Sequence, residues 1–167
     1  MTDTQDNVSY ASPHQEKANG VVSRNVLWAA GVGLFPIPVV DFVGLTAVQL
    51  KMIHELSELY EVPFRKDLGK SIIAGLIASV GAPALAFGSA GALLRGLPVI
   101  GPALGFFALP GFAGALTYAV GKTFTQHFET GGNMLDFDVA GMREHFAKHY
   151  AAGQQQFNNP QPADATT

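Results

Sequence analysis

The sequence predicts an all-α integral membrane protein. We expect a two-helix transmembrane hairpin, an N-terminal membrane-associated helical hairpin and a C-terminal amphipathic helix. Residues 68–128 contain no Asp or Glu, and their only Lys and Arg residues are Lys70, Arg95 and Lys122. Over the whole chain, charged residues make up 14%, against about 25% in an ordinary soluble domain. Such a shortage of charge favours a chain that contacts lipid.

The two uncharged runs on either side of Arg95 are the expected membrane spans, at residues 71–94 and 103–121. Each is close to the roughly 20 apolar residues that a helix needs to cross a bilayer. Two prolines and two glycines at residues 95–102 predict the turn between them. Because most Lys and Arg residues lie outside this turn, the positive-inside rule predicts a multi-pass protein of a bacterial inner membrane with both termini in the cytoplasm.

Upstream of the spans we expect a disordered polar tail over residues 1–21, followed by a helical membrane domain over residues 22–152. Pro36 and Pro38 end the first helix of this domain, because proline lacks an amide donor and disfavours the helical conformation of the residue before it. Asp41 follows as the expected N-cap of the next helix, which is amphipathic.

Residues 26–50 have the length of a third span, but Asp41 and the two prolines lie in the middle of it. A carboxylate near a bilayer centre costs on the order of 2.5–3.5 kcal/mol on insertion scales. Two alternatives stay open: a helical hairpin that dips into the membrane, or a further crossing. Pro36, Pro38 and Asp41 form the candidate binding element. For Asp41, helix capping is weighed against a binding or proton-linked role.

A last amphipathic helix is predicted over residues 139–152, with Asp136 or Asp138 as its cap. The polar residues 153–167 then form a second disordered tail.

The residues that carry most enzyme chemistry are not arranged for it in this sequence. There is no cysteine, which excludes disulfides and thiolate sites. The Gly-Lys-Ser sequence at residues 69–71 lacks the first glycine of a phosphate loop, since Phe64 occupies that position. His145 and His149 have the spacing of two zinc ligands on a helix, but no third ligand follows at a convincing spacing. We therefore expect no catalytic residue, metal or cofactor, and the net charge of −3 gives no indication of a nucleic-acid partner.

Several stretches of the sequence resemble the YcjF-like family, a bacterial membrane domain of unknown function. They are residues 34–41, 48–53, 59–60, 97–101 and 117–121, and the Pro-x-Pro-x-x-Asp element that ends at Asp41 is the most specific. The resemblance covers about residues 22–152. It implies a membrane anchor or membrane-side partner, because the family's domain occurs alone or attached to the C-terminus of GTPases with a Ras-like or Era-like core. This sequence lacks the phosphate loop of such a core, so we expect any GTPase to act from another chain.

The function expected from the sequence is a non-enzymatic membrane anchor or scaffold that recruits a cytoplasmic partner, with a GTPase as the candidate. The alternative is a small oligomeric channel or transporter-like protein that uses Asp41 and the glycine-rich spans. Spacings such as Gly111-x-x-x-Ala115 let helices approach closely, and they leave open both packing within the chain and formation of a homo-oligomer. The expected partners are the lipid bilayer, a cytoplasmic protein and a second copy of the chain.

Overall fold

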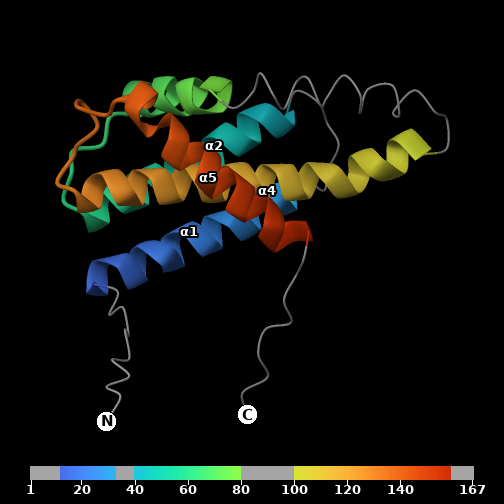
Figure 1. Ribbon diagram of the computed structural model, residues 1–167, viewed down its shortest axis with the longest axis horizontal. Coiled ribbons are helices and arrows are strands. Elements are labelled where there is room, and N and C mark those ends of the chain that lie inside the picture. The colour runs from blue at the N-terminus through green and yellow to red at the C-terminus, as the bar shows by residue number, and fades with distance from the viewer. Residues whose placement is uncertain (1–11, 33–39, 80–99, 159–167) are drawn as a thin grey trace, which may run out of the picture.

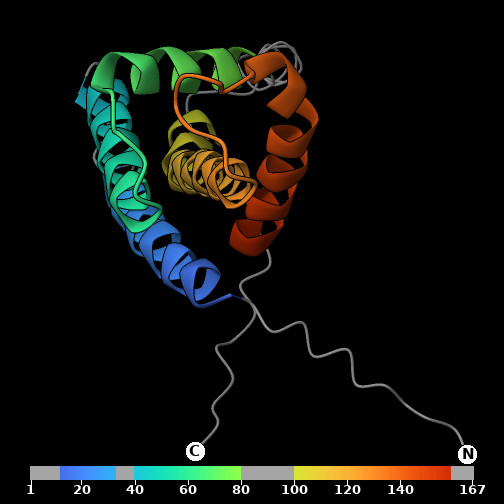
Figure 2. The ribbon, with the colours of Figure 1, turned by 90° about the vertical axis from the view of Figure 1, so that its left-hand side faces the viewer.

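The computed structural model describes residues 12–32, 40–79 and 100–158, and all regular structure in these ranges is helical. The helices are α1 (Pro13–Val32), α2 (Val40–Leu59), α4 (Ile100–Glu129) and α5 (Val139–Asn158), together with a helix over residues 66–79 that lies between α2 and α4 in the chain. Helix α4 occupies the centre, and the other helices surround it (Figure 1, Figure 2).

Contacts at one end of the molecule show the relative directions of α1, α2 and α4. Tyr60, which follows α2, donates from its hydroxyl to Glu129 at the end of α4 over 3.1 Å, and its ring lies 5.9 Å from that of Phe128. Gln15 in the first turn of α1 donates to the same Glu129 over 3.3 Å. Helix α2 therefore runs parallel to α4, and α1 runs antiparallel to both. The loop that joins α4 to α5 lies at this end, whereas α1 ends and α2 begins at the opposite end (Figure 1).

The apolar run of α4 supplies the centre of the core. Its buried side chains include Leu116, Val120, Phe124 and Phe128. These four residues follow one another at intervals of four and form one stripe, and Ala113, Ala115, Ala119 and Thr123 are buried on other sides of the helix. Figure 2 shows the other helices arranged around α4. A helix that is apolar all round is buried either inside a protein or in a membrane. Most of the side chains described in α4, at residues 111–129, are buried by protein.

The predicted transmembrane hairpin is wrong. Within residues 12–32, 40–79 and 100–158, no helix is long and apolar enough to cross a membrane. The second predicted span, residues 103–121, belongs to the central helix α4. The first, residues 71–94, begins in the helix at 66–79, and its remainder lies outside the described residues. The multi-pass topology depends on these spans and is withdrawn with them. An uncharged run could not decide the question, since protein and lipid are both apolar neighbours.

Helix caps explain where α1 and α5 begin. Helix α1 begins at Pro13, so the end of the predicted N-terminal tail is helical. Ser12 Oγ accepts from the amide of Gln15 over 3.2 Å, and Pro13 occupies the first helical position, where an N–H would have no helical partner. Of the two predicted caps for α5, the structure uses Asp138, whose Oδ1 accepts from the amide of Ala140 over 3.0 Å.

Helix α5 continues to Asn158, past the predicted limit at residue 152, and crosses α4 through small residues. A Cβ at Gly153 would lie 3.0 Å from the Cα of Ala115, and a Cβ at Gly114 would overlap the ring of Phe157. Close approach of this kind requires glycine. The Gly111-x-x-x-Ala115 spacing therefore serves packing within the chain, against α5, while formation of a homo-oligomer stays a prediction.

Candidate functional site

The predicted binding element is only partly within the described chain. Pro36 and Pro38 lie outside the described residues, as does most of the segment in which residues 26–50 would dip or cross. Asp41 lies in the first turn of α2, which begins at Val40, and its side chain is outside the description. The capping and binding roles of Asp41 therefore stay predictions.

Large apolar side chains are exposed at the end of the bundle where α1 ends and α2 begins. Leu27 and Trp28 in α1 are 73% and 66% exposed, and Val43 in α2 is 69% exposed. Phe112 of α4 lies at the same end, 38% exposed, with its ring edge-on to Tyr150 at 6.2 Å. We call Leu27, Trp28, Val43 and Phe112 the apolar end. Large exposed apolar side chains at one end of a bundle are candidates for contact with lipid or another protein.

The same segments of α1 and α2 bury polar side chains. Asn25 of α1 is buried although the neighbouring Leu27 and Trp28 are exposed, and Gln49 of α2 is fully buried. Two amide side chains are thus buried among the apolar residues of the core while large apolar side chains are exposed nearby, which departs from the usual distribution. An apolar environment over the outer face would account for the exposed Trp28 and Val43.

One carboxylate ties α1 to α2. Glu55 Oε2 accepts from Asn25 Nδ2 over 2.8 Å and pairs with Arg24 at 3.0 Å, while Oε1 lies 2.6 Å from the Nζ of Lys51. Burial alone would raise the pKa of this carboxyl. The hydrogen bonds from Lys51, Asn25 and Arg24 outweigh burial, so the pKa of Glu55 lies below its ordinary value. The carboxylate is charged at neutral pH and already paired, which makes it a structural group.

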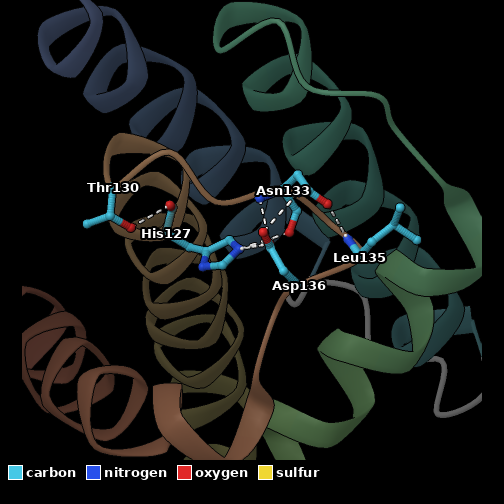
Figure 3. A network of polar contacts seen from close by, with 5 residues as sticks. All are labelled: His127, Thr130, Asn133, Leu135 and Asp136. Atoms are coloured by element: carbon cyan, nitrogen blue, oxygen red, sulfur yellow. Dashed lines mark hydrogen bonds and ion pairs between the residues drawn. The ribbon is translucent and has the colours of Figure 1, made fainter.

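At the opposite end, a hydrogen-bond network closes the loop between α4 and α5 (Figure 3). The Asp136 carboxylate accepts from the backbone amide of Asn133 over 2.7 Å and from its Nδ2 over 2.9 Å. His127 Nε2 lies 3.1 Å from the same carboxylate and 2.9 Å from the Asn133 carbonyl. Because both of these neighbours are acceptors, Nε2 carries the proton. The Asn133 bond and His127 keep the pKa of Asp136 below its ordinary value.

The loop network is structural rather than catalytic. Gly131 begins the loop with a φ of +82°, a left-handed conformation that favours glycine, and Gly132 packs against the ring of His127. The side chains of His127 and Asp136 therefore form hydrogen bonds with each other and with Asn133 of the loop. Leu135, in the same loop, is 71% exposed.

The two histidines at zinc-ligand spacing are bridged by a glutamine. His145 Nδ1 lies 3.1 Å from Gln126 Nε2, and His149 Nε2 lies 3.3 Å from Gln126 Oε1. Burial lowers the pKa of His149, and the positive charges of Lys122, His145 and Lys148 lower it further. In the part of the chain that the structure describes, no three His, Asp or Glu side chains are grouped to hold a metal ion.

The sequence matches the family described as "Domain of unknown function (DUF697)" over residues 7–155. The chain belongs to this family. The match confirms the family resemblance inferred from the Pro-x-Pro-x-x-Asp element and the stretches that follow it. The DUF697 chain is also 35% identical over 137 residues to "Magnetosome membrane protein 22" of Magnetospirillum gryphiswaldense, an alignment that covers 82% of this chain and 70% of that protein. No solved structure matches the DUF697 chain.

Sequence reasoning alone missed the apolar end. Leu27 and Trp28 gave no separate signal, because they belong to an apolar run in which neighbouring residues such as Val26 are buried. The one available signal is Trp28, the only tryptophan of the chain, which lies one turn after Arg24. A tryptophan beside a cation on one helix face is typical of helices at a membrane surface.

Proposed function

We propose that this chain is a non-enzymatic, membrane-associated protein whose apolar end contacts lipid. The observation that carries the proposal is the exposure of Leu27, Trp28 and Val43 at one end of the bundle. The similarity to a protein named as a magnetosome membrane protein supports the same setting. A bacterial cell membrane is the location that we propose.

The size of the apolar end is sufficient for reversible binding. Burial of one large aliphatic or aromatic side chain contributes about 1.5–3 kcal/mol. Complete burial of three such side chains would contribute about 4.5–9 kcal/mol, and because Leu27, Trp28 and Val43 are about two thirds exposed the gain is about 3–6 kcal/mol, which corresponds to an affinity in the millimolar to tens-of-micromolar range. Trp28 suits such a position, because its indole has an apolar body and an N–H that can stay in water.

Vesicle co-sedimentation tests the proposal with a matched pair of variants. Leu27→Glu removes an exposed leucine from the apolar end and should weaken vesicle binding about tenfold to a hundredfold. Leu135→Glu makes the same change at the opposite end, where the leucine is 71% exposed, and should leave vesicle binding unchanged. Equal effects of the two substitutions, or no binding by the unaltered chain, would contradict the proposal.

We also propose a scaffold role, in which the lipid-bound chain recruits a cytoplasmic protein, with a GTPase as the first candidate. The exposed Leu135 supports such a contact, because it projects from a loop that the His127–Asp136 network holds in one conformation. A purified GTPase with a Ras-like or Era-like core is the partner to test by pull-down. Leu135→Glu should reduce its capture while Leu27→Glu should not. Capture that is insensitive to Leu135 would refute this surface as the docking site.

A further inference from the structure

Helices α1, α2 and α4 come closest at Gly121. A Cβ at this position would lie 2.6 Å from Cγ2 of Val22 in α1 and 3.0 Å from Sδ of Met52 in α2. The three helices therefore meet at one level, which only a glycine permits. We call this line of contact the three-helix seam.

The polar residues of the seam lie one turn away from this contact. Because α2 is parallel to α4 and α1 is antiparallel, a step toward the start of α4 is a step toward the start of α2 and the end of α1. Three or four residues in this direction lead from Gly121 to Thr117 in α4. The same step leads from Met52 to Gln49 in α2 and from Val22 to Asn25 in α1. Residues three or four positions apart share a helix face, so all three side chains face the seam. All three are buried.

These side chains have buried atoms with no protein partner. Among the described residues, nothing hydrogen-bonds to Asn25 Oδ1, to Oε1 and Nε2 of Gln49, or to Thr117 Oγ1. The orientation of Asn25 is fixed, because its Nδ2 donates to the Val21 carbonyl over 2.9 Å and to Glu55 over 2.8 Å. Unpaired buried polar atoms are rare in folded proteins, since each loses its hydration without a replacement.

We propose that Asn25, Gln49 and Thr117 form a binding site for a small neutral molecule with a hydroxyl group, of which water is the simplest. The three side chains are uncharged, so the site has nothing to neutralise an ion. Asn25 Oδ1 requires a donor, whereas Gln49 and Thr117 each offer both a donor and an acceptor. A hydroxyl-bearing molecule of this kind can make the about three hydrogen bonds that buried waters usually make. The bond from Asn25 to the partly exposed Glu55 connects the site to the protein surface.

Nuclear magnetic resonance of the full labelled chain tests the site directly, with water as the probe. We expect cross-peaks between long-lived water and the side-chain amide protons of Gln49, with nuclear Overhauser effects of opposite sign in the laboratory and rotating frames. Absence of these cross-peaks in the unaltered chain, or a direct hydrogen bond from Gln49 to Thr117 in their place, would overturn the proposal.

A substitution gives a second readout. Gln49→Leu should abolish bound water at Thr117 and lower Tm by at least about 2–4 °C, because it leaves the remaining polar atoms with fewer partners. Without a bound molecule, the same change removes two unpaired atoms and should raise Tm, which would refute the proposal. Ser57→Ala is the control, since it removes another buried, unpaired polar atom of α2, two turns away from Gln49. The water cross-peaks at Gln49 should persist in this variant. If Gln49→Leu does not fold, the spectrum of the unaltered chain decides.

Discussion

Gly121→Ala measures how tightly α1 and α2 pack against the central helix. Position 121 lies inside α4, where alanine has a higher helix propensity than glycine by about 0.8–1.0 kcal/mol. The new Cβ would lie 2.6 Å from Val22 and 3.0 Å from Met52, both closer than ordinary van der Waals contact. Such overpacking typically costs about 1–3 kcal/mol. The net expectation is a loss of about 0–2 kcal/mol in the free energy of unfolding.

The matched control is Gly20→Ala in α1. A Cβ at this position meets no described atom within 4 Å, so only the propensity gain of about 0.8–1.0 kcal/mol applies. In denaturant unfolding, Gly20→Ala should therefore raise the free energy of unfolding relative to the unaltered chain. Gly121→Ala should leave it unchanged or lower it. Both variants gain the same helix propensity, so the difference between their free energies of unfolding measures the cost of the new Cβ at the three-helix seam.

A double mutant locates the clash. Val22→Ala alone should destabilise, because it removes buried methyl groups, but it also makes room for the new Cβ at position 121. The double mutant should therefore lose less stability than the sum of the two single changes. If Gly121→Ala stabilises the chain as much as Gly20→Ala does, the described approach of α1 to α4 is wrong.

Three further outcomes test other parts of the structure. Asp136→Asn should speed amide hydrogen exchange in the loop after α4, whereas the fully exposed Asp67→Asn should not. The pKa of His149 is lowered from 6.5 in the folded chain, so the unfolded chain binds more protons and stability should fall as pH drops through 6.5. His149→Gln should flatten this dependence of stability on pH, and an unchanged dependence would contradict the role of His149. Phe157→Ala should cost about 1–2 kcal/mol, since the ring is partly buried, and exchange should quicken only near the end of α5; uniform quickening would show that this end is not a separate contact.

Local signals were sufficient for helices whose ends are set by neighbouring residues. Asp138 caps α5 at the predicted start, because an N-cap requires only a side chain within reach of the next amides. Ser12 and Pro13 carry the same kind of signal for α1, but the polar composition around them favoured a disordered tail. The end of α5 could not be predicted, because its last turns depend on Phe157 and Gly153 packing against α4.

The candidate site depended on contacts between distant helices. Val22 and Val26 are buried while Leu27 and Trp28 are exposed. The sequence around them mixes apolar residues with Ser23, Arg24 and Asn25, and does not by itself show which apolar side chains meet the other helices. The register of α1 against α4 decides which face of α1 points inward. The burial of Asn25 beside Val22 and Val26 is a further consequence of that packing.

The sequence by itself determined an all-helical chain, its family, and a central segment with too little charge to face water. Only the tertiary structure decided what surrounds that segment. The uncharged run at residues 103–121 is equally compatible with lipid and with other helices, because hydropathy measures the cost of contact with water and not the identity of the apolar neighbour. In α4 the neighbours include Val22, Met52 and Phe157 of the same chain, and among the described residues the apolar end is the surface that we propose for contact with a membrane.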